Sequence, residues 1–302
     1  MSTKKERCLN TNFITEITLD AAERNSFKAG IKHKNFDSLK EKFQQLETNL
    51  ATNTKGFILH LEAEQENFFD YQELAEIPAL MGTYFGNLLV QNEKGDKVIM
   101  VYDRDRLGSM FQGARYHQTR EGGSIHTDNV NIPEPWEYLF LSCIETAEVG
   151  GENILVDGVK VHSILKAKYP QALKVLEDNF YWEMRGVSDA LYQAPIITYD
   201  KKGEPLFRHL RPYMESAHQK ANVPLTTDQL YALDVLDALT NSSEYQMRYR
   251  MRKGDILITR DAQVLHGRTC FSDALEAVTF DEYHQGKGKI LKRTMERIWI
   301  KK

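Results

Sequence analysis

The hydrophobic positions of the first third of the chain follow the period of a helix and then that of short strands. Residues 36–50 are predicted to form an amphipathic helix, because their apolar residues recur at steps of three and four: Phe36, Leu39, Phe43, Leu46 and Leu50. The apolar run 57–61 predicts a buried strand, and 98–102 predicts another. Residues 71–91 predict a helix that breaks near Pro78 and Gly86. We expect this segment, about residues 1–110, to pack on the rest of the protein.

From residue 124 onward, short β-like runs separated by turns dominate. Strands are expected at 124–130, 138–144, 153–157, 194–199, 206–210, 247–251, 255–259 and 278–284. Helical patterns over 159–177 and after Thr226 interrupt them, and residues 200–203 predict a hairpin turn. No repeat or linker divides the chain. The pattern favours one domain over residues 1–302, of mixed α/β and β-rich class, with a jelly-roll-like core and flanking helices.

Composition and charge narrow the class of protein. The chain has 302 residues, of which 41% are hydrophobic and 27% charged, so it can bury a sizeable core. A formal net charge of −4 argues against a nucleic-acid partner or a membrane surface. The three cysteines are widely spaced without a CxxC pair, as expected of free thiols in a reducing compartment. With no signal-peptide pattern and no membrane-spanning apolar run, we expect a cytoplasmic protein, and a homo-oligomer stays open.

The candidate chemistry lies in His126-Thr127-Asp128 and in His266, far along the chain. In an extended strand, side chains at i and i+2 point to the same face, so His126 and Asp128 can hold one ion together. Two imidazoles and one carboxylate are the facial triad of non-haem Fe(II) sites. The HxD pattern alone is weak, since a strand histidine often bonds a backbone carbonyl. The preceding glycines, Gly122 and Gly123, and the second histidine after an apolar strand favour a metal site.

Five segments in order resemble the TauD/TfdA-like (taurine-dioxygenase-like) family of Fe(II)- and 2-oxoglutarate-dependent dioxygenases. They are 123–128 (GSIHTD), 149–153 (VGGEN), 155–157 (LVD), 265–269 (LHGRT) and Arg293-x-x-x-Arg297-Ile298-Trp299. The resemblance covers about residues 115–299. It implies a distorted double-stranded β-helix, with Fe(II) as the metal and 2-oxoglutarate and O2 as co-substrates. It also implies that His126, Asp128 and His266 are the metal ligands and catalytic residues.

The same resemblance implies residues that bind 2-oxoglutarate. Arg293 matches the family arginine that pairs with the distal carboxylate, and a guanidinium suits that task because it forks onto a carboxylate. Asn153 stands where the family usually has threonine, and its amide can donate to the same carboxylate. The gap between His266 and Arg293 is longer than in compact members, with extra residues at about 276–288, so Arg268 is a second candidate. Alternatively, Arg293 is a solvated charge of a basic tail.

Candidate substrate-binding residues are Arg297, Asn129 and Arg208. In sulfonate- and carboxylate-acting relatives the arginine that matches Arg297 binds the anionic end of the substrate. The alternative for Arg297 is a surface pair with Glu296 or Asp281. Other polar residues near these motifs could also line a pocket: Tyr116, His117, Asn131, Trp136, His209 and Arg211.

These features predict an enzyme that hydroxylates an unactivated C–H bond of a small polar substrate with a carboxylate, such as a free amino acid or a derivative. The retained Asp128 disfavours halogenation, because related halogenases have a small residue in place of this carboxylate. Desaturation and oxidative rearrangement use the same ligands and stay open. A hypothesis of another class is a non-catalytic metal-binding β-barrel protein that holds zinc or no metal. A nucleic-acid demethylase is disfavoured by the acidic balance.

Overall fold

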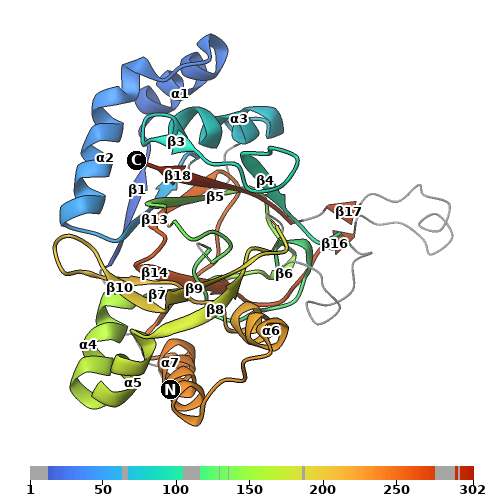
Figure 1. Cartoon of the computed structure of the whole chain (residues 1–302). Coiled ribbons are helices and arrows are strands. Elements are labelled where there is room, and N and C mark those ends of the chain that lie inside the picture. Colours follow the sequence, from blue (N-terminus) through green and yellow to red (C-terminus); the bar gives the residue numbers. More distant parts are fainter. Residues whose placement is uncertain are drawn as a thin grey trace, which may run out of the picture.

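Two β-sheets that face each other form the centre of the protein, and helices cover their outer sides (Figure 1). The computed structural model describes residues 13–62, 67–104, 116–128, 130–134, 136–185, 188–275, 290–291 and 293–302. Within these residues the protein is of mixed α/β class with a β-rich centre, as the sequence predicts.

The larger sheet has seven strands in the order β1-β2-β13-β5-β18-β3, with β4 paired to β18. Their bounds are β1 (Ile14–Thr18), β2 (Gly56–His60), β3 (Asn87–Leu88), β4 (Val98–Val101), β5 (Tyr138–Glu145), β13 (Asp255–Arg260) and β18 (Thr294–Lys301). Strand β2 runs parallel to β1 and antiparallel to β13. The N-terminal segment therefore contributes strands to the same sheet as the C-terminal part of the chain.

The smaller sheet has the order β12-β7-β14 and is antiparallel throughout. Its strands are β7 (Asn153–Asp157), β12 (Gln246–Tyr249) and β14 (Val264–Arg268). Two-stranded pairs lie beside it: β6 (Val149–Gly150) with β15 (Phe271–Ser272), β8 (Asn179–Glu183) with β9 (Leu191–Pro195), β10 (Ile197–Tyr199) with β11 (Pro205–Phe207), and β16 (Ala274–Leu275) with β17 (Ile290–Leu291).

The helices form two groups on opposite sides of the sheets (Figure 1). Helices α1 (Ala21–His33), α2 (Lys40–Thr52) and α3 (Tyr71–Gly82), with the short 3-10 helix η1 (Asp37–Leu39), lie against the larger sheet. Helices α4 (Gly158–Lys168), α5 (Pro170–Leu176), α6 (Arg211–Ala221) and α7 (Thr227–Asn241) lie on the side of the smaller sheet. A further 3-10 helix, η3, spans Tyr116–Gln118. In the described part of the chain, no helix combines the length and the apolar character needed to cross a membrane.

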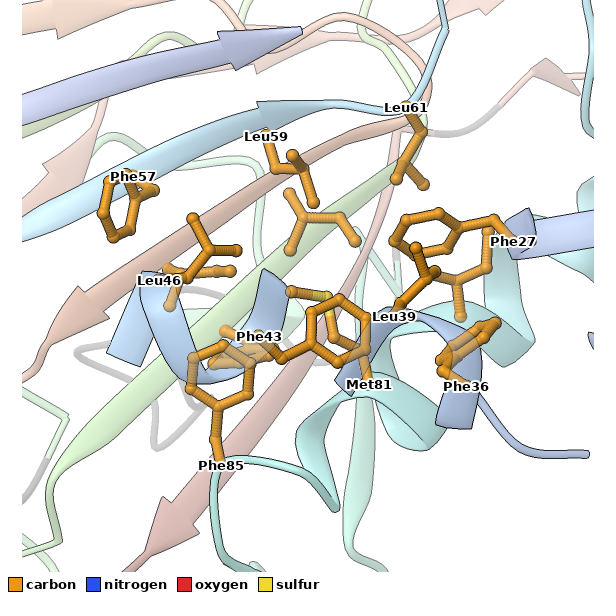
Figure 2. Close-up of a cluster of buried hydrophobic side chains, with 14 of the residues drawn as sticks. Phe27, Phe36, Leu39, Phe43, Leu46, Phe57, Leu59, Leu61, Met81 and Phe85 are labelled. Atoms are coloured by element: carbon orange, nitrogen blue, oxygen red, sulfur yellow. The ribbon is translucent and has the colours of Figure 1, made fainter. Parts of the chain in front are cut away.

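The core between helices α1–α3 and the larger sheet is rich in aromatic rings (Figure 2). Phe27 of α1 contacts Phe36 and Phe43 with ring centroids 5.0 and 6.0 Å apart, and Phe43 also meets Phe85 at 6.1 Å. All four side chains are buried. Buried aromatic rings contribute large apolar areas, so this core fixes the larger sheet on its outer side.

Side chains along the central strands alternate between the helix-covered faces and the space between the sheets. On β13, Ile256 and Ile258 join the core with helices α1–α3, whereas Leu257 faces the other sheet. On β7, Val156 joins the core with helices α4–α7, whereas Leu155 packs in the same inner cluster as Leu257. This period of two is that of an extended strand. The inward-facing positions near one end of this inner space carry the polar residues described below.

Several sequence predictions are confirmed as elements, with bounds shifted by a few residues. The runs 57–61 and 98–102 correspond to β2 and β4, the pattern at 36–50 to η1 and α2, and the turn at 200–203 joins the antiparallel pair β10 and β11. The pattern at 159–177 is two helices, since Pro170 begins α5, as proline favours a first helical position. The expected strand 278–284 lies outside the described residues.

Two predictions about single elements are wrong. The helix expected over 71–91 ends at Gly82, and Pro78 lies within it, where the buried residues Leu74, Ile77 and Met81 anchor α3 to the core. The described residues of 124–130 do not form a strand: within this segment His126 makes an isolated bridge. The tertiary packing, and not the local pattern, sets both outcomes.

A buried acidic side chain of the larger sheet faces the helix side. Glu296 on β18 has the same orientation as Ile298 and Ile300, which belong to the aromatic core, and is 4% exposed. Its Oε2 has no hydrogen-bond partner among the described residues. Burial raises the pKa of Glu296 from 4.5 to about 8, because the charged form loses its hydration.

The stability of the wild-type protein is expected to fall between about pH 5 and about pH 8, and the variant Glu296→Gln is expected to lack this fall. In this window the unfolded chain has lost the proton and the folded protein keeps it, so wild-type stability falls as pH rises. The free energy of unfolding at the upper end should increase by on the order of a few kcal/mol in the variant. Urea denaturation across this range measures it. The exposed Glu41→Gln is the control, and an equal pH dependence in wild type and Glu296→Gln would contradict the prediction.

Candidate metal centre and adjoining pockets

Two backbone hydrogen bonds bring the two histidines of the candidate metal site together. The amide of His126 donates to the carbonyl of His266 at 2.8 Å, and the amide of His266 donates back at 2.7 Å. The two residues are therefore opposite each other as an antiparallel bridge. Strand β14 turns its residues Val264, His266 and Arg268 to the inner space, since Val264 packs in the inner cluster and Arg268 lines the pocket of the site.

The side chains of His126, Asp128 and His266 converge on one point. One ligand atom from each lies within 4.8 Å of the others, and the rest of the described chain forms no other cluster of this kind. The Nε2 atoms of His126 and His266 lie 3.7 and 3.9 Å from Oδ1 of Asp128. Two neutral imidazoles and a carboxylate at this spacing can share one divalent ion, and they are the ligand types of non-haem iron.

Burial and neighbouring charges set the protonation states that metal binding requires. Burial, aided by the nearby His266, lowers the pKa of His126 to about 3, and burial also lowers the pKa of His266. Burial by itself raises the pKa of Asp128, but the positive charge of Arg297, together with the two histidines and the hydrogen bond from Trp299, lowers this pKa to about 2. At neutral pH the rings are uncharged and the carboxylate is ionised, so all three groups offer lone pairs to a metal.

Outer hydrogen bonds hold the segment that carries the ligands. Nδ1 of His126 lies 2.8 Å from the carbonyl of Ser124, which orients Nε2 toward the cluster. The amide of Asp128 donates to Oδ1 of the buried Asp261 at 3.1 Å. Between them, Thr127 exchanges two hydrogen bonds with the backbone of His209, at 2.8 and 3.0 Å. These bonds take the place of a regular strand ladder, so the segment stays extended without belonging to a sheet.

Arg293 is buried in the pocket next to the three ligands, as the predicted role in binding 2-oxoglutarate requires. It is 2% exposed, donates through Nη2 to the carbonyl of Gly151 at 3.5 Å, and lies over the ring of Phe271 at 5.2 Å. Gly151 has φ +72°, and a Cβ at this position would lie 2.9 Å from Nε of Arg293. The second glycine of the Gly-Gly-Glu motif is thus needed both for its backbone conformation and for the space that the arginine occupies.

Asn153 lines the same pocket as Arg293 and the metal cluster. Its side chain is 4% exposed, and its Nδ2 finds no acceptor among the described residues. A buried amide donor without an acceptor is costly, and a carboxylate in the pocket would satisfy it. The donor set of the cluster and this amide therefore fit the metal and the 2-oxoglutarate that the sequence resemblance implies.

Arg268, the second candidate for the carboxylate partner, is tied to the backbone. Its Nη2 donates to the carbonyls of Thr119 and Glu121, the latter at 3.0 Å. Its guanidinium lies 5.2 Å from the ring of Phe271, on which Arg293 also lies. Arg268 lines the pocket, but its hydrogen bonds fix the segment that precedes the metal-binding residues.

Arg297 lies at the mouth of the site, where it lines both the pocket of the metal cluster and a larger adjoining cavity. Its Nη1 donates to Oδ1 of Asp128 at 3.2 Å, and its Nε donates to Oε1 of Gln91 at 3.0 Å. The alternative of a surface pair with Glu296 is excluded by the strand alternation, which points Glu296 toward the helices. The other alternative partner, Asp281, lies outside the described residues.

The remaining substrate candidates lie elsewhere. Asn129 falls outside the described residues. Arg208 is buried, donates to the carbonyls of Ile132 and Pro133 at 2.7 Å each, and does not line the pockets beside the metal cluster. Its guanidinium is used to hold a loop, so the substrate role predicted for it lacks support from the structure.

His117, one of the polar residues expected to line a pocket, does line the pockets of the site. Sequence reasoning missed two residues: Gln91 lines the pockets, and Trp299 donates from Nε1 to Oδ2 of Asp128 at 3.0 Å. The strand period was a usable signal for Trp299, which is two residues from Arg297 and therefore on the same face. Nothing in the local sequence around Gln91 indicates its contact with Arg297, because the fold alone brings them together.

Comparisons with known proteins agree with this site. Residues 55–295 match the family described as "Taurine catabolism dioxygenase TauD, TfdA family". FR-33289 synthase of Streptomyces rubellomurinus (strain ATCC 31215) is 23% identical over 230 residues, which cover 74% of this chain and 62% of that protein. Gamma-butyrobetaine dioxygenase of Homo sapiens is 30% identical over 162 residues, which cover 51% of this chain and 41% of that protein. The matches thus span less than two thirds of either relative.

A solved structure shows the same fold. It is that of an asparagine oxygenase in complex with Fe(II), 2S,3S-3-hydroxyasparagine and succinate, which superposes with a TM-score of 0.69 over 94% of this chain and 93% of that chain at 14% identity. The likeness confirms the predicted fold class, with a double-stranded β-helix as its core. The matched family model spans most of the sequence. The cofactors predicted from the motifs, Fe(II) with 2-oxoglutarate and O2, are those of this family. The chain belongs to the TauD/TfdA family of dioxygenases.

Proposed function

We propose that this protein is a dioxygenase that hydroxylates an unactivated C–H bond of a small carboxylate-bearing substrate, a free amino acid or a derivative of one. The observation that carries the proposal is the cluster of His126, Asp128 and His266, with the buried Arg293 and the half-buried Arg297 lining the same pocket. The similar asparagine oxygenase structure contains 2S,3S-3-hydroxyasparagine, and another similar protein is named gamma-butyrobetaine dioxygenase. These two compounds support this substrate class.

In this proposal His126, Asp128 and His266 would hold the iron, a ligand set that leaves coordination positions open for the co-substrates. Bound iron supplies the activation of dioxygen, coupled to decarboxylation of 2-oxoglutarate to succinate and carbon dioxide. Arg293 forks onto the distal carboxylate of 2-oxoglutarate, and the amide of Asn153 donates to the same group. The apolar side chains of Leu139, Leu141 and Met295 line this pocket and limit the access of water.

Arg297 binds the carboxylate of the substrate. A cavity of about 610 Å³ adjoins the metal pocket, and the guanidinium lies where the two meet. Gln91 holds Nε of Arg297 and itself donates through Nε2 to the carbonyls of Lys97 and Arg297, at 2.9 and 3.0 Å. With Nε fixed, the Nη atoms are directed toward the site. A substrate anchored there by its carboxylate presents its own carbon chain to the metal side.

The test of the function is a screen of amino acids and their derivatives with the protein loaded with Fe(II) in the absence of oxygen. After O2 is admitted, succinate from 2-oxoglutarate and a product heavier by one oxygen atom are expected by mass spectrometry. A product lighter by two hydrogen atoms would instead indicate desaturation. Absence of iron-dependent succinate across the screen, with or without substrate, would favour a non-catalytic metal-binding protein.

The variant His266→Ala is expected to lose iron-dependent succinate formation. Removing a metal ligand should cost more than the roughly 10- to 100-fold that removal of an outer partner costs. Metal affinity, measured by titration with Co(II), should fall in parallel. His33→Ala, an exposed histidine of α1, is the matched control and should keep both. Retention of succinate formation by His266→Ala would rule out this residue as a ligand.

The variant Arg293→Lys is expected to raise the KM for 2-oxoglutarate by about 10- to 100-fold, because lysine cannot fork onto a carboxylate. Arg268→Lys is the matched comparison: its guanidinium bonds backbone carbonyls, so thermal stability should fall more than affinity for 2-oxoglutarate. Steady-state kinetics and melting curves separate the two effects. If Arg268→Lys raised this KM more than Arg293→Lys, the assignment would be reversed.

The variant Arg297→Ala is expected to separate consumption of 2-oxoglutarate from product formation. With the substrate found in the screen, product formed per succinate should fall about tenfold or more, because the substrate loses its charged anchor. Slow succinate formation without substrate should continue. The ratio is measured by mass spectrometry, with the exposed Arg248→Ala as control. An unchanged ratio in Arg297→Ala would remove this residue from substrate binding.

A further inference from the structure

Two buried tryptophans stack beside the metal-binding carboxylate. Trp299 of β18 and Trp136, which precedes β5, have ring centroids 4.1 Å apart and an interplanar angle of 23°. Both are 2% exposed and pack with Leu139. Trp299 also lines the small pocket that contains His126 and Asp128. The stack therefore fixes the plane of an aromatic ring at the wall of the metal centre.

The two oxygens of Asp128 have different surroundings. Oδ1 faces the imidazoles, at 3.7 and 3.9 Å from their Nε2 atoms, and accepts from Arg297. Oδ2 accepts from Nε1 of Trp299 at 3.0 Å. An indole N–H can only donate, and the stacked ring cannot rotate away without losing its packing. The indole thus holds Oδ2 and leaves Oδ1 directed toward the histidines.

The same ring also contacts Arg297. The guanidinium lies 4.5 Å from the ring centroid of Trp299, so the face of the indole holds the arginine and its edge holds the carboxylate. Trp136 offers an internal comparison. Its own Nε1 is buried and has no hydrogen-bond partner among the described residues. Stacking in this pair therefore does not require a hydrogen bond from the indole. The hydrogen bond from Trp299 to Asp128 is thus not explained by packing of the stack.

We propose that Trp299 is a positioning residue that restricts Asp128 to binding the metal through one oxygen. The inference rests on the proposed function, because it requires a metal at the cluster. A metal held by the two histidines, one oxygen of Asp128 and 2-oxoglutarate would also have to admit dioxygen. The second oxygen of Asp128, if it bound as well, would compete with dioxygen for the metal. An outer hydrogen bond to the second oxygen prevents this.

The experiment compares Trp299→Phe with Trp136→Phe in the full-length protein, with Co(II) as the probe metal. Each change removes one indole N–H from the stack and keeps an aromatic ring. Trp299→Phe is expected to weaken Co(II) binding by about tenfold or more, and to alter the visible absorption spectrum of Co(II), which reports the number of ligands. Trp136→Phe should retain the wild-type spectrum and affinity. Melting temperatures of the metal-free variants measure the loss of packing, which the two should share.

The outcomes separate this inference from the proposed function. A wild-type protein that binds no Co(II) at the cluster would overturn the metal site, and the role of Trp299 with it. A Trp299→Phe protein with wild-type affinity and spectrum would overturn the role of Trp299 alone. Equal losses of affinity in both variants would assign the effect to packing of the stack and would also overturn it.

A measurement on the wild-type protein covers the case in which Trp299→Phe does not fold. The chain has three tryptophans, so labelling with 15N gives three indole N–H signals by NMR. Trp136→Phe and Trp182→Phe assign two of them, and the third belongs to Trp299. Titration with Zn(II) should shift the Trp299 signal most, and its N–H should stay protected from exchange in the metal complex. A Trp299 signal that does not respond to Zn(II) would contradict the inference.

Discussion

Two reciprocal hydrogen bonds between the backbones of His126 and His266 are the constraint on which the site depends. They join a segment that belongs to no sheet to strand β14 of the smaller sheet. The pairing fixes the two imidazoles with ring centroids 4.5 Å apart. Because β14 is itself paired to β7, the metal cluster is anchored to the rigid part of the fold and not to a free loop.

Strand β18 supplies the other half of the site through the same geometric rule. Arg297 and Trp299 face the inner space, together with Arg293 just before the strand, whereas Glu296 and Ile298 face the helices. Strand β18 and the residue before it therefore provide the proposed contacts to co-substrate, substrate and metal ligand. The outer face of β18 packs in the aromatic core with residues of α3 and β5. This packing holds the strand in place, and with it the arginines on its inner side.

Asp128 stays ionised although it is buried, because charged and polar groups surround it. Asp128 is surrounded by Arg297, Trp299 and the two histidines, and its pKa is lowered in spite of its burial. An isolated carboxylate in that place would become protonated. The opposite case is Glu296, which is buried on the helix side, forms no ion pair within the described part of the chain and has a raised pKa. Two buried carboxyl groups thus behave in opposite ways on the two sides of the larger sheet.

The sequence by itself determined the family, the metal-ligand candidates and most of the strands, because these depend on residue types at fixed spacing. His126-x-Asp128, the glycine pair before Glu152 and the two arginines four residues apart are local patterns. Tertiary structure decided what those residues contact. It replaced the expected strand at 124–130 with a single bridge, assigned Arg208 to a loop, and placed Gln91 and Trp299 beside Arg297. Such contacts join distant segments, and no local period in the sequence encodes them.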